Sequence, residues 1–119
     1  MTSKTEAEAF AAEWIAAWNS HDLARILSHY APDFEFASPF IVQVAGEPSG
    51  RLRGHAAVGA YWAKALARLP DLRFELESVL WGMHSLVICY RRFDGHRAAE
   101  WFEFGADGKV IRSAAQYGE

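Results

Sequence analysis

The segment Arg97-Ala98-Ala99-Glu100-Trp101-Phe102-Glu103-Phe104 has the alternating pattern of a half-buried β-strand. Because successive side chains of a strand point to opposite faces of the sheet, one face should carry Ala98, Glu100, Phe102 and Phe104. Glu100 would then lie among small and aromatic side chains, where an unpaired charge is costly. Either this carboxyl has a cationic partner, or its pKa is raised and it exchanges protons near neutral pH.

The composition limits the class of protein. The 119 residues are enough for one domain, residues 1–119, with a core of its own. A net charge of −3 and scattered Lys and Arg argue against nucleic acid or an anionic membrane as a partner. The single cysteine, Cys89, excludes an internal disulfide, and no run reaches the roughly 20 apolar residues of a membrane span. We therefore predict a cytoplasmic protein with no nucleic-acid partner and no membrane contact.

The hydrophobic periodicity predicts an α+β fold with helices on one face of a curved sheet. Helices are expected over residues 5–19, from 23 to about 30, and 55–69, and the turn at Ala31-Pro32-Asp33 should end the second. Strands are expected over residues 34–38, 73–81, 86–93, 97–104 and 110–117. Pro39 should end the first strand, which residues 40–44 are expected to continue or restart. Short connections that contain glycine predict antiparallel hairpins between the last four strands.

Several short motifs follow one another in a recognisable order. They are Trp18-Asn19-Ser20-His21-Asp22-Leu23, Tyr30-Ala31-Pro32-Asp33-Phe34, Ser38-Pro39, Arg53-Gly54-His55-Ala56-Ala57-Val58 with Tyr61-Trp62, and Phe102-Glu103-Phe104 with Asp107-Gly108-Lys109-Val110. Together they resemble the nuclear transport factor 2-like superfamily, especially its SnoaL-like (polyketide-cyclase-like) and ketosteroid-isomerase-like branches. The resemblance implies a cone-shaped roll, in which a strongly bent, mainly antiparallel sheet wraps around three helices and an apolar pocket.

The same resemblance implies which side chains line the pocket. Besides Glu100, the expected lining residues are Trp14, Trp18, Phe36, Ser38, His55, Tyr61, Trp62, Phe102, Phe104, Ser113, Ala115 and Tyr117. The opposite parity should place apolar side chains on the outer face of the sheet, namely Val87, Cys89, Phe93 and Trp101. Members of the superfamily often dimerise through this face, and an apolar outer face is typical of an interface. We therefore predict a homodimer with its sheets packed together.

The residues match the chemistry of the two branches unequally. A ketosteroid isomerase needs a carboxylate base before the strand-ending proline, a tyrosine, and a protonated acid that stabilise an oxyanion. Here Ser38 precedes Pro39, and Trp14 stands at the tyrosine position, so only Glu100 matches and steroid isomerisation is not expected. The cyclase-like branch needs one inward acid, a role that Glu100 can fill.

Two readings of function remain open. In the first, a small hydrophobic, carbonyl-bearing molecule binds in the pocket, and Glu100 transfers a proton in a cofactor-free isomerisation, cyclisation or dehydration, with Tyr61, Tyr117 or Trp14 as donors. In the second, the protein is a non-catalytic carrier or association domain whose own aromatic side chains fill the cone. Cavity volume distinguishes the two, since ligand sites typically exceed about 300 Å³.

Three alternatives for Glu100 itself also remain. It can act in proton transfer, form a structural ion pair with Arg97, His55 or Arg53, or point outward into solvent. The five histidines show no metal-ligand spacing, and we expect neither a metal nor another cofactor.

Overall fold

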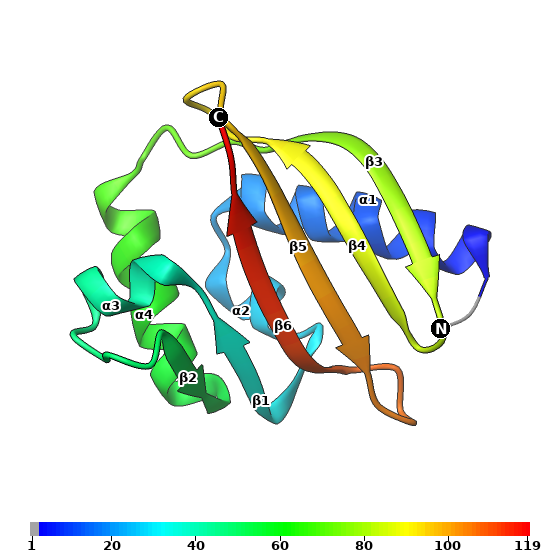
Figure 1. Cartoon of the computed structure of the whole chain (residues 1–119), viewed down its shortest axis with the longest axis horizontal. Helices are drawn as coiled ribbons and strands as arrows, with labels where there is room; N and C mark the ends of the chain where they lie inside the picture. Colours follow the sequence, from blue (N-terminus) through cyan, green and yellow to red (C-terminus); the bar gives the residue numbers. More distant parts are fainter. Residues whose placement is uncertain (1–2) are drawn as a thin grey trace.

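A six-stranded sheet bends around the helices of the protein (Figure 1). The structure is a computed structural model, and it describes residues 3–119. The helices are α1 (Lys4–Ser20), α2 (Leu23–Leu27), α3 (Pro39–Val44) and α4 (Gly54–Arg68). The strands are β1 (Tyr30–Ala37), β2 (Arg51–Arg53), β3 (Glu75–Gly82), β4 (Ser85–Arg91), β5 (Arg97–Phe104) and β6 (Val110–Tyr117). In the sheet they follow the order β2-β1-β6-β5-β4-β3.

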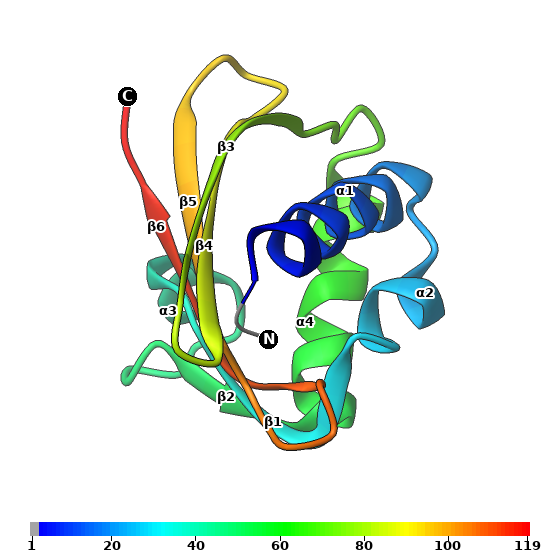
Figure 2. The same ribbon diagram turned by 90° about the vertical axis from the view of Figure 1, so that its right-hand side faces the viewer.

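The predicted α+β class and the bent, mainly antiparallel sheet are confirmed. Strands β3 to β6 form consecutive antiparallel pairs, whereas β1 runs parallel to β6. Figure 2 shows α1, α2 and α4 together on one side of the sheet. The inner face of the sheet therefore packs against helices, and side chains of that parity are the ones that become buried. None of the helices within residues 3–119 has the length and apolar character that a bilayer crossing needs.

The first strand begins earlier than its sequence pattern indicates. Helix α2 ends at Leu27, and β1 starts at Tyr30 rather than Phe34. Its register against β6 shifts between Tyr30 and Glu35. Pro32 lies in this irregular part, where its missing N–H interrupts no regular ladder of hydrogen bonds. The proline that suggested a helix end and a turn is thus accommodated inside a strand.

The expectation of strand structure after Pro39 is wrong, because residues 39–44 form α3. The Ser38 hydroxyl accepts a hydrogen bond of 3.2 Å from the backbone N–H of Phe40 and so caps the helix. Pro39 occupies the start of the helix, where its fixed φ is favourable and its lack of an N–H costs nothing. The chain then returns through Gly50, whose φ of +69° suits glycine, into the short strand β2 beside β1.

The amphipathic helix α1 supplies the aromatic side chains that fill the bend of the sheet. Its first turn is capped by Ser3, whose hydroxyl accepts from the N–H of Glu6 at 3.1 Å. Trp14 and Trp18, one turn apart, are buried against Phe74, with ring centroids 5.6 and 5.7 Å from it. The side of α1 that carries these tryptophans is therefore the surface that faces the sheet.

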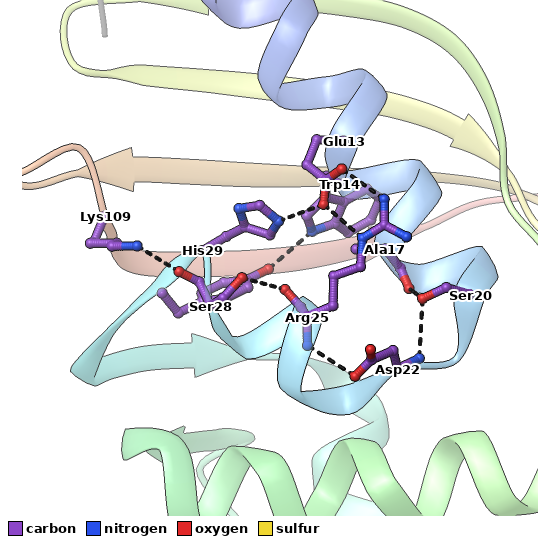
Figure 3. Close-up of polar contacts among 10 residues, drawn as sticks. Glu13, Trp14, Ala17, Ser20, Asp22, Arg25, Ser28, His29 and Lys109 are labelled. Atoms are coloured by element: carbon purple, nitrogen blue, oxygen red, sulfur yellow. Dashed lines mark hydrogen bonds and ion pairs between the residues drawn. The ribbon is translucent and has the colours of Figure 1, made fainter.

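A cluster of charged side chains ties α1 to α2 and to the start of β1 (Figure 3). Glu13 accepts hydrogen bonds from Arg25 Nε at 3.0 Å and Nη2 at 2.8 Å, and its carboxylate lies 3.1 Å from His29 Nε2. The hydrogen bonds from Arg25 are the main cause that lowers the pKa of Glu13 to about 2. This cluster holds in place the residues next to Trp14 and Tyr30.

Candidate functional site

Glu100 lies in the middle of β5 and faces the helices. Its register partners are Ile88 on β4 and Ala115 on β6, both of which are buried on the same inner face. The side chain of Glu100 is 4% exposed. Within residues 3–119, and leaving the aromatic side chains aside, the only other buried polar side chains are Ser38 and Ser113. The alternation of the strand therefore places a carboxyl inside an apolar core, where it must be either paired or neutral.

None of the bases suggested as partners from the sequence pairs with this carboxyl. Arg53 bonds to Glu35 instead, with Nη2 3.2 Å from the carboxylate. The Nε2 of His55 lies 2.9 Å from the backbone carbonyl oxygen of Tyr30. Arg97 is exposed, and its parity places it on the other face of β5. Across residues 3–119, no salt bridge includes Glu100.

Since no salt bridge within residues 3–119 includes Glu100, burial has the largest influence on the pKa of its carboxyl. Burial raises the pKa of Glu100 to about 8, although hydrogen bonds from the Tyr90 and Ser113 hydroxyls oppose this increase. Of the two hydroxyls, that of Tyr90 has the larger effect on this pKa. At pH 7 the carboxyl is therefore mainly neutral, and it can both donate and accept a proton close to physiological pH.

The charge of Glu100 affects the pKa of all four tyrosines of the chain. Burial raises the pKa of each phenol above its ordinary value, and the carboxylate of Glu100 raises it further. The phenols therefore stay protonated and can act as hydrogen-bond donors. Tyr30 also accepts a hydrogen bond of 3.0 Å from Trp14 Nε1, and the hydroxyls of Tyr117 and Ser38 lie 3.3 Å apart.

A cavity of about 90 Å³ lies between the inner face of the sheet and helices α1 and α4. Most of its wall is aromatic or aliphatic, and the polar groups are the Glu100 carboxyl, three phenols and the Arg92 guanidinium. The lining residues are Trp14, Trp18, Phe36, Phe40, Tyr61, Trp62, Ala65, Leu69, Leu72, Phe74, Tyr90, Arg92, Phe93, Glu100 and Tyr117. This volume is well below the roughly 300 Å³ of typical ligand pockets.

The structure brings together some of the side chains that the sequence proposed for the pocket. The cavity wall includes Glu100, Trp14, Trp18, Phe36, Tyr61, Trp62 and Tyr117. The remaining ones lie outside that wall, namely Ser38, His55, Phe102, Phe104, Ser113 and Ala115.

The residues outside the cavity wall contact other parts of the protein. Phe102 and Phe104 face inward but pack on Phe10, with ring centroids 5.2 and 5.0 Å away. Ser38 caps α3 behind Tyr117, and His55 contacts Tyr30 and Phe34 rather than a pocket mouth. Ala115 and Ser113 are buried on β6 beside Glu100 and Phe102.

Sequence reasoning missed Tyr90 and Arg92. The alternation of β4, in which Leu86, Ile88 and Tyr90 share the buried parity, contains the signal for Tyr90. Arg92 has no comparable signal, because it follows the last residue of the strand. For the same reason the placement of Phe93 on the outer sheet face is wrong. Strand β4 ends at Arg91, and Phe93 lies in the following connection, where it lines the cavity.

The wall combines an uncharged acid with phenol and indole donors, which suits proton transfer on an apolar molecule. Trp18 Nε1 is a buried donor in this region without a hydrogen-bond partner among residues 3–119. Residues 3–119 contain no group of three or more His, Cys, Asp or Glu side chains placed to hold a metal ion.

The chain is similar to proteins of one known family. The model of the SnoaL-like domain family matches residues 11–113. A SnoaL-like protein of unknown function from Burkholderia thailandensis, known from a crystal structure, shares 53% sequence identity with this chain. The two structures superpose with a TM-score of 0.95 over 98% of each chain. No curated protein matches.

More distant structures share the fold and differ in their described activity. One is a proposed isomerase of the SnoaL-like family from Agrobacterium tumefaciens, at 17% identity and TM-score 0.78, covering 97% of this chain and 99% of that one. Another is AclR, a proposed hydroxylase from Streptomyces galilaeus, at 23% identity and TM-score 0.76, covering 98% and 91%. At these identities the likeness extends to the fold alone.

Proposed function

The chain belongs to the SnoaL-like domain family, and from that premise we propose that it binds a small apolar carbonyl compound on which Glu100 transfers a proton. The observation that carries this proposal is the isolation of Glu100, a buried carboxyl that forms no ion pair within residues 3–119 and whose pKa desolvation raises to about 8. A charged or polar group of this kind costs stability in an apolar core. Its presence at a cavity wall is therefore better explained by chemistry than by packing.

The proposed reaction is an enolisation without a cofactor. The ionised fraction of Glu100 removes a proton from the carbon next to the carbonyl, and the resulting acid returns it to another carbon or to a leaving group. Negative charge that develops on the carbonyl oxygen accepts a hydrogen bond from Tyr90 or Tyr117, whose phenols line the same cavity. Isomerisation, aldol-type cyclisation and dehydration all share this first step.

A second candidate function is a non-catalytic carrier or association domain, and the cavity volume favours it. About 90 Å³ is less than the roughly 150 Å³ of an apolar cavity known to take benzene. A ligand of one ring or more therefore requires side chains at the rim to move. Phe93 is one such side chain, since it lines the cavity and is 41% exposed.

The two candidates differ in a reaction that needs no knowledge of the natural substrate. We expect the protein to accelerate hydrogen–deuterium exchange at the carbon next to the carbonyl of cyclopentanone in D₂O, followed by proton NMR. Glu100→Gln should abolish the acceleration, because the amide cannot accept that proton. Glu103→Gln is the matched control, since Glu103 lies on the outer parity of the same strand. Equal exchange rates in wild type and Glu100→Gln would refute Glu100 as the proton-transfer group.

We further propose a homodimer that forms through the outer face of the sheet. The strand registers place Leu80, Val87 and Trp101 in one row across β3, β4 and β5. Leu80 is 61% exposed, and Val87 and Trp101 are half-buried. An apolar row of this kind on an open sheet face is typical of an interface.

A further inference from the structure

Arg92 lies where the cavity meets the surface of the protein. It lines the cavity of about 90 Å³ and also a surface groove of about 450 Å³. Phe74 and Phe93 line both hollows as well, so the two adjoin along these three side chains. The remaining wall of the groove consists of Asp71, Arg73, Glu75, Arg91 and Gly95. A molecule that enters the cavity from the groove must therefore pass Arg92.

The guanidinium of Arg92 is held in place but weakly paired. It stacks on the rings of Phe40 and Tyr117, 5.5 and 5.3 Å from their centroids. Its closest acid is Asp94, with Nη2 3.6 Å from Oδ2, which is too long for a strong hydrogen bond. Arg25 shows the contrast within the same chain, because it binds Glu13 through two short hydrogen bonds. Arg92 thus keeps donors for another acceptor.

The two charged residues of the cavity, Arg92 and Glu100, lie at different ends of it. Among the lining residues that belong to the described part of the chain, Arg92 is the only cation and Glu100 the only acid. Arg92 lowers and Glu100 raises the pKa of Tyr61, Tyr90 and Tyr117, so these phenols sense both charges. Glu100 but not Arg92 influences Tyr30. The cavity therefore has an acidic, mainly neutral inner end and a cationic mouth.

We propose that the ligand of this site is an apolar ring that carries a carboxylate, and that Arg92 binds the carboxylate at the junction between the cavity and the groove. This inference rests on the proposed function and names its substrate class. A planar guanidinium can bind a carboxylate through two parallel N–H···O bonds. The ring then points toward Glu100, and any remaining part of the ligand extends into the groove, which reconciles a small cavity with a larger ligand.

Benzoate and benzamide form a matched pair of probes for this inference, because they have the same size and differ in charge. Binding can be followed by NMR on the indole N–H signals. Those of Trp14, Trp18 and Trp62 should shift, since these residues line the cavity. Trp81 and Trp101 lie outside it and serve as internal references. We expect benzoate to bind about tenfold more tightly than benzamide, the difference that a charge-assisted hydrogen bond of about 1.4 kcal/mol produces.

Variants of Arg92 separate recognition of charge from packing. Arg92→Met keeps an apolar stem against Phe40 and Tyr117, and it should bind the two probes equally. Arg92→Lys retains the charge but not the planar fork, and it should keep part of the preference. The control Arg112→Met removes one positive charge at the far end of β6, where Arg112 lies 3.7 Å from Glu103. It should retain the full preference for benzoate.

The binding results distinguish a failure of the carboxylate inference from a failure of the proposed function on which it rests. Equal binding of benzoate and benzamide by the wild type would overturn the carboxylate inference and leave a pocket for neutral molecules. An unchanged preference in Arg92→Met would overturn the role of Arg92. If neither probe shifts the three indole signals up to its solubility limit, the proposed pocket function fails, and the inference fails with it.

Discussion

Tyr90 on β4 and Glu100 on β5 lie diagonally across one pair of strands, and the hydroxyl of Tyr90, as a hydrogen-bond donor, lowers the pKa of the buried Glu100 carboxyl against the effect of burial. The register that pairs Ile88 with Glu100 and Tyr90 with Ala98 creates this diagonal on the inner face of the sheet. Among residues 3–119, neither side chain is hydrogen-bonded to a cation or forms a salt bridge. The pair is therefore a neutral acid next to a neutral phenol at the wall of an apolar cavity.

Removal of the Tyr90 hydroxyl should raise the pKa of Glu100. Burial sets this pKa at about 8, and the hydrogen bond from Tyr90 acts against burial. In Tyr90→Phe the ionised carboxylate loses its main donor, and we expect an increase of about one unit. Carbon NMR of the Glu100 carboxyl, assigned with Glu100→Gln, measures the change. Tyr117→Phe is the control, because the Tyr117 hydroxyl pairs with Ser38. Equal pKa values in wild type and Tyr90→Phe would contradict this relationship.

The contribution of Glu100 to the free energy of unfolding should fall as the pH rises from about 4.5 to about 8. The folded state keeps its proton up to about pH 8, whereas the unfolded chain releases it near 4.5. Between these values the folded state binds more protons, so rising pH favours unfolding. The loss amounts to a few kcal/mol, at about 1.4 kcal/mol per pKa unit.

Urea unfolding of wild type and Glu100→Gln at several pH values measures this effect. The stability of the variant relative to wild type should increase across that range, because glutamine does not ionise. The comparison depends on the slope with pH and not on the absolute stability of either protein. A constant difference between the two proteins would show that Glu100 titrates alike in the folded and unfolded states.

Glu13 should have the opposite pH dependence. Hydrogen bonds from Arg25 lower its pKa from 4.5 to about 2, so its contribution is present above about pH 4.5 and is lost as the pH falls toward 2. The Glu13 side chain is 40% exposed, and solvent screening limits the effect of Glu13→Gln to about 1 kcal/mol. Unfolding at pH 7 and at acid pH checks the sign. Glu8→Gln, on the same helix but 58% exposed, should change stability less.

The outer face of the sheet should support self-association. Trp101→Glu places a charge in the row of Leu80, Val87 and Trp101, and desolvating that charge would oppose a dimer. We expect sedimentation velocity to show a dimer for the wild type and a monomer for Trp101→Glu. Lys64→Glu introduces a charge on the exposed side of α4, away from the outer face of the sheet, and should leave the dimer intact. A wild-type protein that stays monomeric over a wide concentration range would contradict the proposed interface.

Local sequence pattern was sufficient for the strands that build the site. The predicted bounds of residues 97–104 and 110–117 coincide with β5 and β6, because a period of two in side-chain burial specifies both the strand and its faces. The same parity placed Glu100 inside. It did not foresee α3 or β2, since α3 depends on the cap from Ser38 and the three-residue β2 on pairing with β1.

The sequence alone was enough to establish the family resemblance and the α+β class, and it favoured an inward Glu100, because each depends on the order and periodicity of residues along the chain. Three-dimensional packing was needed to show that Arg53 and His55 have other partners, that Tyr90 meets Glu100, and that Arg92 lies at the cavity mouth. These are relations between distant segments. Their distances depend on how the sheet bends and how the helices pack against it, and the pKa of Glu100 follows from that packing.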